Sequence, residues 1–179
     1  LLRANLAHQH FLKTAKCVNA ACTGAPTIST LDAVGDTGRF SSIVIGIDGL
    51  PIMSYYDFGN DDLRVAKCLN AACTGVPTLT TLDAVGLVGE YTSIASGVDG
   101  LPIISYQDSA NTNDDLKVAA CGNIDCTGGA SIVVVETPGN VGQFTALAIG
   151  ADGLPIISHL DATNLDLRVA KCATTTCVG

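Results

Sequence analysis

Four copies of one cysteine-containing segment divide the chain into tandem repeats. The copies begin at Leu12, Leu63, Leu116 and Leu167, and each ends at the second cysteine of a C-x4-C pair. The first cysteines of these pairs are residues 17, 68, 121 and 172, so the repeat intervals are 51, 53 and 51 residues. A period near fifty residues indicates stacked or radially arranged copies of one supersecondary unit rather than one irregular domain.

The second repeat contains four segments with the composition of β-strands. Two apolar runs, residues 41–47 and 50–56, flank the dipeptide Asp48-Gly49. This dipeptide predicts a type I′ hairpin, in which both turn residues have positive φ. Alternating side chains over residues 63–68 and the threonine-rich run 78–85 predict a third and a fourth strand. Because the first two runs are almost continuously apolar, we expect them to form a buried inner pair.

Four short antiparallel strands in about fifty residues match a propeller blade in size and connectivity. We therefore expect an all-β fold of tandem four-stranded antiparallel, blade-like repeats that is β-propeller-like. A β-solenoid and a string of small sandwiches remain alternatives. The expected layout is one repeat domain with an irregular joining segment at 1–11, a partial repeat at 12–38, repeats at 39–89 and 90–142, and a partial repeat at 143–179.

Phrases of the type DGLPIISYYD followed by DLRVAKC resemble a repeat of about 51 residues in uncharacterised secreted bacterial proteins. The resemblance covers almost everything after Lys13. It implies blade-like folds and a secreted protein. It brings no established catalytic residues, so it implies no site on this chain.

The four strand types are not present in equal numbers. The third type, which begins near the four leucines named above, occurs four times, whereas each of the other types occurs three times. Three complete periods also fall below the roughly four blades that a propeller needs. We therefore expect that one chain does not close a ring alone. Either it is a piece of a longer array, or neighbouring subunits complete its ends by adding strands, with residues 1–11 as the joining segment.

The eight cysteines form four local pairs, which predicts four disulfides and an oxidising compartment. Each short loop closed in this way should contribute about 2 kcal/mol of stability. Zinc ligation would require two pairs from different repeats to converge, and it remains an alternative together with reduced thiols. The predicted disulfides are Cys17–Cys22, Cys68–Cys73, Cys121–Cys126 and Cys172–Cys177.

Acidic turns follow the second strand of each repeat. Oxygen ligands in such turns suit Ca²⁺, but Asp and Asn side chains also commonly cap their own turns, which is the interpretation we favour. Turn geometry likewise accounts for the aspartates of the three Asp-Gly pairs, and no other cofactor is expected. The turn residues are Asp57, Asn60 and Asp62; Asp108, Asn113 and Asp115; and Asp161, Asn164 and Asp166, with Asp48, Asp99 and Asp152 in the Asp-Gly pairs.

Charge and motif content exclude several classes of function. The formal net charge of -8 and the scattered cations argue against nucleic-acid binding. No apolar run reaches the roughly 18 residues of a membrane span. The sequence contains no phosphate-binding or dinucleotide motif. We align His159 with Tyr56 and Gln107 as an ordinary strand residue. We assign no catalytic or cofactor-binding residues and expect no enzyme.

These patterns favour an extracellular or cell-surface structural protein. Its expected partner is itself, assembled head to tail into a fibre or surface layer through strand complementation. The alternative is a carbohydrate-binding or adhesive propeller module of a longer secreted protein, with glycans as partners. A repeated sugar site should repeat its stacking aromatic residue, but we find no third equivalent of Tyr55 and Tyr106.

Overall fold

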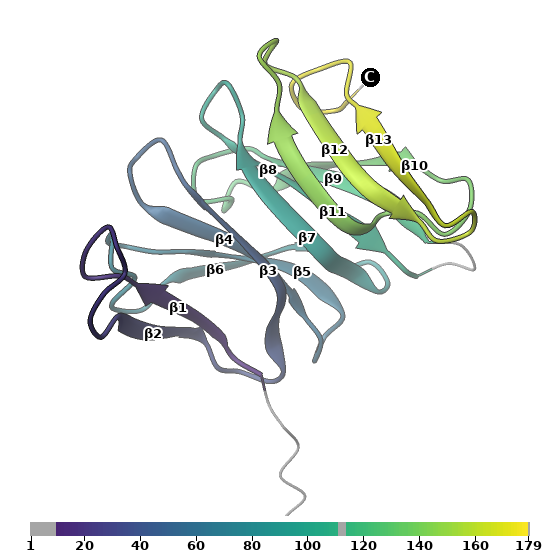
Figure 1. The fold of residues 1–179 in the computed structure, drawn as a ribbon. Helices are drawn as coiled ribbons and strands as arrows, with labels where there is room; N and C mark the ends of the chain where they lie inside the picture. Colours follow the sequence, from purple (N-terminus) through teal and green to yellow (C-terminus); the bar gives the residue numbers. More distant parts are fainter. Residues whose placement is uncertain (1–9, 111–113, 179) are drawn as a thin grey trace, which may run out of the picture.

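A computed structural model describes residues 10–110 and 114–178, which form four antiparallel sheets without a helix. Figure 1 shows the sheets following one another like the blades of an open fan. The first sheet contains β1 (Leu12–Lys16) and β2 (Thr27–Asp32). The second contains β3 (Thr37–Ile45), β4 (Pro51–Asp57), β5 (Asp62–Lys67) and β6 (Thr78–Asp83). The third contains β7 (Val88–Ser96), β8 (Pro102–Asp108), β9 (Asp115–Cys121) and β10 (Ala130–Glu136). The fourth contains β11 (Gln143–Ile149), β12 (Pro155–Asp161) and β13 (Asp166–Lys171).

The expected all-β fold of blade-like repeats is confirmed. In the second and third sheets, consecutive strands pair in chain order, so each sheet is one repeat. The first sheet has only the third and fourth strand types, and the fourth sheet lacks the fourth type. Within the described residues, the strands do not close a ring. The predicted joining segment at 1–11 lies outside the described residues except for its last two positions.

The hairpin between β3 and β4 differs from the predicted type I′ turn. Gly49 has φ of 76°, but Asp48 is not among the residues with positive φ. The Gly49 amide donates to the Gly46 carbonyl at 2.9 Å, and the Leu50 amide donates to Asp48 Oδ1 at 3.1 Å. The loop therefore has three residues and a glycine bulge. The Asp48 side chain stabilises this turn by accepting the Leu50 amide.

Burial along the sheets also differs from the prediction that the first two strands form the inner buried pair. The most buried strands are the second and third of each complete sheet, such as β4 and β5, whereas β3 is half exposed. The fourth strand is a sheet edge, and β3 lacks the covering that β3 and β4 give to the equivalent strand β7, which has no exposed residue. The fourth strand ends at Asp83 rather than Val85, because the Asp83 carboxylate accepts the Val85 amide at 3.2 Å in a turn.

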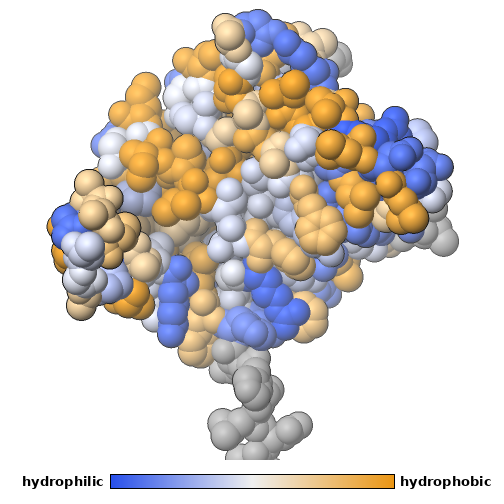
Figure 2. All heavy atoms as spheres, in the orientation of Figure 1, coloured by the Kyte–Doolittle hydropathy of each residue, from blue (hydrophilic) through white to orange (hydrophobic). Residues whose placement is uncertain are grey.

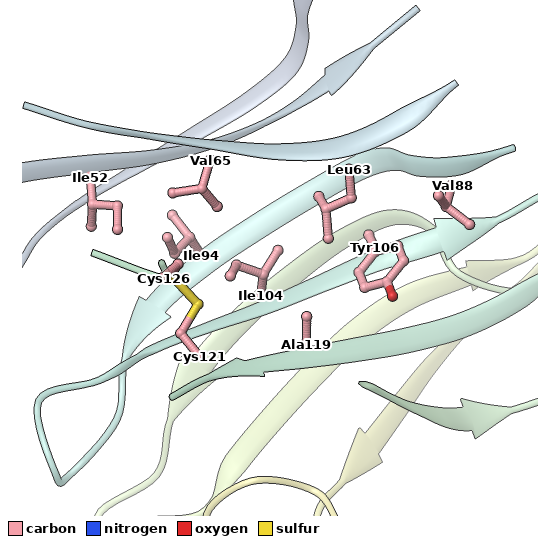
Figure 3. Packing of buried hydrophobic residues seen from close by; sticks show 10 residues of the cluster. All are labelled: Ile52, Leu63, Val65, Val88, Ile94, Ile104, Tyr106, Ala119, Cys121 and Cys126. Carbon is pink, nitrogen blue, oxygen red and sulfur yellow. A yellow bond between two sulfur atoms is a disulfide. The ribbon is translucent and has the colours of Figure 1, made fainter. Parts of the chain in front are cut away.

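Successive sheets pack face to face through apolar side chains. Figure 3 shows this contact between the second and third sheets, where Ile52, Leu63 and Val65 face Ile94 and Ile104. Each of these five side chains is buried. We call such a contact between consecutive sheets a joint.

A leucine and a glycine meet at every joint. A Cβ atom built on Gly89 would lie 2.7 Å from the Cα of Leu63, and φ of Gly89 is +102°. Both facts require glycine, because a side chain would collide with backbone and the conformation is left-handed. The same contact occurs between Gly38 and Leu12 at 2.6 Å, and at Gly142 the distance to the Cα of Leu116 is 3.1 Å. The closeness of two backbones therefore sets the spacing of the sheets.

Replacing Gly89 with alanine should destabilise the fold strongly. We expect a loss of about 3 kcal/mol or more in the free energy of unfolding, from the clash with Leu63 added to the left-handed backbone. Gly35→Ala is the matched control, because Gly35 has φ of +83° and open space around it. Its cost should be about 1 kcal/mol. Denaturant unfolding measures both, and equal losses would contradict the close contact.

Candidate functional site

A buried ionic cluster accompanies each joint. At the second joint, the hydroxyl of Tyr106 in β8 donates to Asp83 Oδ2 at 2.7 Å. Lys117 Nζ lies 2.5 Å from Asp108 Oδ2 and 3.4 Å from Asp83 Oδ2. Burial opposes the charge of Lys117, but its hydrogen bonds with the two carboxylates raise its pKa. Asp83 belongs to one sheet and the other three residues to the next, so the cluster ties two sheets together.

The other joints contain equivalent clusters with different residues. At the first joint, Asp32 accepts hydrogen bonds from Tyr55 at 2.7 Å and Arg64 at 2.8 Å. At the third joint, His159 Nε2 lies 3.1 Å from Glu136 Oε2. Its other ring nitrogen accepts the Gly142 amide at 3.3 Å.

His159 is therefore equivalent to Tyr55 and Tyr106, and the predicted alignment with Tyr56 and Gln107 was wrong. The strand register shows this directly, because His159 pairs with Arg168 as Tyr55 pairs with Arg64. The tyrosine hydroxyls are buried and donate to carboxylates, so these aromatics hold joints together and present no face for a sugar.

The eight cysteines are joined as four disulfides, each within one C-x4-C segment. The second cysteine of every pair has positive φ, between 52° and 61°. The first three bridges close the loop between a third and a fourth strand, and the Cys172–Cys177 bridge lies directly after β13. In the third sheet, Cys121 and Cys126 pack in the joint with the second sheet.

The acidic turns use their carboxylates internally. Asp57 accepts the Gly59 amide at 3.1 Å and the Asn60 side-chain amide at 2.9 Å. Asp161 accepts the Thr163 amide and the Asn164 side chain in the same way. Asn113 of the equivalent turn lies outside the described residues. Among the residues that are described, no group of three or more His, Cys, Asp or Glu side chains converges as a metal site. The possible Ca²⁺ site stays a prediction.

The outward side of the fourth sheet, which we call the C-terminal face, exposes side chains that are buried elsewhere. Leu167 and Val169 of β13 are 79% and 61% exposed, whereas their equivalents in β5, Leu63 and Val65, are 0% exposed. A shallow groove of about 310 Å³ lies beside them. Figure 2 shows apolar residues gathered over the part of the molecule formed by β11–β13. The groove is lined by Ala146, Leu147, Ala148, Ile156, Ser158 and Val169.

The opposite end of the fan, which we call the N-terminal face, also exposes apolar side chains that are buried elsewhere in the repeat. Ile43 and Ile45 of β3 are 56% and 57% exposed, although Ile94, the equivalent of Ile43, is buried. A groove of about 470 Å³ separates β3 from β1. At an internal joint, the first two strands of the preceding sheet occupy this space. The groove is lined by Leu12, Lys13, Thr14, Ala15, Ser41, Ser42, Ile43 and Met53.

A row of aromatic rings crosses the first strands of three sheets. Phe40, Tyr91 and Phe144 each have φ of 52°. The ring centroids of Phe40 and Tyr91 are 4.4 Å apart, and those of Tyr91 and Phe144 are 4.5 Å apart. In the second and third sheets, an irregularity of strand register surrounds this residue, as a β-bulge does. Phe144, at the end of the row, is 65% exposed.

This aromatic row was not predicted from the sequence. The signal was present, because an aromatic residue stands two positions after the joint glycine in each repeat: Gly38 and Phe40, Gly89 and Tyr91, Gly142 and Phe144. Positive φ at these three aromatics is an unusual conformation that must be held by the surrounding structure.

Comparison with known proteins gives a fold relationship only. No family model matches the chain, and no curated protein matches it. One similar solved structure is the alpha-L-arabinofuranosidase from Lactobacillus brevis, with a TM-score of 0.56 and 13% sequence identity. The similarity covers 76% of this chain and 50% of that chain, so this chain corresponds to about half of that protein. At this identity the similarity concerns the fold.

No membrane-spanning helix is present among the described residues.

The folded protein should resist ionisation of its tyrosines at alkaline pH. Burial raises the pKa of all four, Tyr55, Tyr56, Tyr91 and Tyr106. The resulting stabilisation is complete below pH of about 10, where unfolded tyrosines are neutral, and is lost as the pH rises further. A spectrophotometric titration should give a tyrosinate midpoint above about 10 for folded protein and near 10 in denaturant. Equal midpoints, with folding intact, would contradict the buried hydroxyls.

Proposed function

We propose that this protein is a structural, non-catalytic protein whose copies assemble head to tail, with the C-terminal face of one copy on the N-terminal face of the next. The observation that carries this proposal is the exposure of Leu167 and Val169 where the repeat elsewhere buries leucine and valine. Covering two such side chains is favourable by about 1.5–3 kcal/mol each.

The two faces are complementary because they are the two halves of one internal joint. Ser54 of β4 accepts the Thr92 hydroxyl at 2.7 Å, and Ser105 of β8 donates to Thr145 at 2.8 Å. Ser158 in the C-terminal face and Ser41 in the N-terminal face are the corresponding residues. A second copy would therefore find a partner for the same hydroxyl contact.

The direction of the contact favours open assembly. Two different faces meet, so each added copy presents another free face, and the contact does not terminate unless the rotation between copies closes a ring. Four disulfides are typical of proteins in oxidising compartments, and we place this assembly outside the cell or at its surface as a fibre or layer.

A second candidate function is carbohydrate binding at the aromatic row. Exposed aromatic rings offer apolar faces with polar edges nearby, as ligand sites often do. Phe144 is the ring with the freest surface. Head-to-tail assembly accounts for the same exposure, because Phe144 would continue the row onto Phe40 of the next copy, and we therefore prefer it.

The variant Leu167→Asp should block assembly. An aspartate at this position would be buried without a partner in the contact, so the apparent dissociation constant should rise at least about a hundredfold. Sedimentation velocity and negative-stain microscopy should show elongated particles for the 179-residue protein and monomers for the variant. The matched control is Val85→Asp, because Val85 is 78% exposed and lies in a turn. It should assemble normally.

A wild-type protein that stays monomeric at high concentration would overturn the proposal. In that case a following repeat of a longer polypeptide is the better occupant of the C-terminal face. The monomeric variant Leu167→Asp can also be tested for carbohydrate binding on a glycan array. Selective binding that disappears in Leu167→Asp/Phe144→Ala, without loss of folding, would favour the carbohydrate-binding module.

A further inference from the structure

We propose that assembly occurs by strand exchange, in which β13 of one copy takes the place of β1 in the next copy. This inference rests on the proposed function and specifies how the two faces join. Figure 1 shows β1 and β13 at opposite ends of the fan. Both are strands of the third type, and each carries at its start the leucine that a joint requires, Leu12 in β1 and Leu167 in β13.

Only one leucine can occupy the joint beside Gly38. Leu12 fills it now, since a Cβ on Gly38 would lie 2.6 Å from the Cα of Leu12. The preceding backbone completes the contact, because the Thr37 amide donates to the His10 carbonyl at 2.9 Å. Leu167 has no corresponding glycine among the described residues. When the fourth sheet docks on the N-terminal face, Leu12 and Leu167 therefore compete for one position.

The position two residues after the leucine favours β13 in this competition. Val65 and Val118 occupy this position in β5 and β9, and both are completely buried in apolar clusters. In β13 the residue is Val169, but in β1 it is Thr14. The Thr14 hydroxyl is buried without a hydrogen-bond partner among the described residues. A buried hydroxyl without a partner is unfavourable, and exchange would replace it with a methyl group.

The charged residues also favour β13. Arg168 of β13 already contacts Glu136 and lies 3.4 Å from Asp161 within its own copy. The equivalent residue of β1, Lys13, is exposed and has no ion pair with another described residue. Arg168 therefore stays in the third joint of its own copy while Leu167 and Val169 enter the new contact, and β1 leaves without breaking an ion pair.

The remaining strands fit the space that the exchange opens. The groove between β1 and β3 would receive β11 and β12 of the incoming copy, as β7 receives β3 and β4 at the second joint. The composite sheet then runs β11, β12 and β13 from one copy and β2 from the next. It is a complete four-stranded repeat with no strand type duplicated.

One hydrogen bond of the internal joints is missing from this contact. The amides of Ile94 and Leu147 donate to the hydroxyls of Ser42 and Ser93 at 3.2 and 3.1 Å. At the contact between copies, the acceptor position is Ala146. We therefore expect Ala146→Ser to supply the acceptor for the Ile43 amide of the next copy and to tighten assembly by about threefold to tenfold.

The decisive experiment is Thr14→Val in the full 179-residue chain, with the dissociation constant measured by sedimentation velocity. If β13 replaces β1, the valine stabilises the strand that must leave, and assembly should weaken by roughly tenfold. If β1 stays and β13 leaves, the same variant should strengthen assembly. A thermal melt of the monomer checks the variant, which should be at least as stable as wild type.

Hydrogen exchange gives an independent readout of the leaving strand. On assembly, amides of residues 12–16 should lose protection and amides of residues 166–171 should gain it. The inverse pattern, or protection of both strands, would overturn the exchange while leaving head-to-tail assembly intact. Absence of assembly in wild type and Ala146→Ser alike would overturn both proposals.

Discussion

The close approach of a leucine to a glycine is the contact on which the rest of this structure depends. At Leu63 and Gly89 two backbones come so near that neither a side chain nor an ordinary φ fits. Because the leucine lies near the start of the third strand and the glycine lies in the first strand of the next sheet, the contact fixes both the spacing and the order of the sheets. The first strand of each sheet therefore requires the third strand of the preceding sheet beside its glycine.

The ionic clusters strengthen the joints but tolerate more change. The ring beside the carboxylate is tyrosine at two joints and His159 at the third, and the cation is Arg64, Lys117 or Arg168. A carboxylate can accept from any of these donors, so the cluster survives substitution as long as charge and reach are kept. Removal of one partner would leave a buried charge, which explains why every joint retains its carboxylates.

The sequence predicted the features that recur in every repeat: strand number, strand order and the local cysteine pairs. It did not predict features that depend on neighbouring strands. The exposure of β3 follows from the absence of first and second strands in the sheet before it, because β7 is also an edge strand but is covered by β3 and β4 and has no exposed residue. The misplacement of His159 by one residue is not such a limit, because the segments PIMSYYD, PIISYQD and PIISHLD already align it with Tyr55 and Tyr106. The positive φ of Tyr91 follows from a local bulge that composition does not reveal.

An array with equal numbers of each strand type would have ends that join by simple docking. The described residues instead contain one more strand of the third type than of any other, so joining two copies must release a strand. The replacement strand restores most of the interactions that the released strand made, and the net free energy of exchange then depends on the few positions where the two strands differ. Thr14 and Val169 are such positions. A threonine in place of one buried valine can therefore decide which strand leaves, although it barely affects the fold of a single copy.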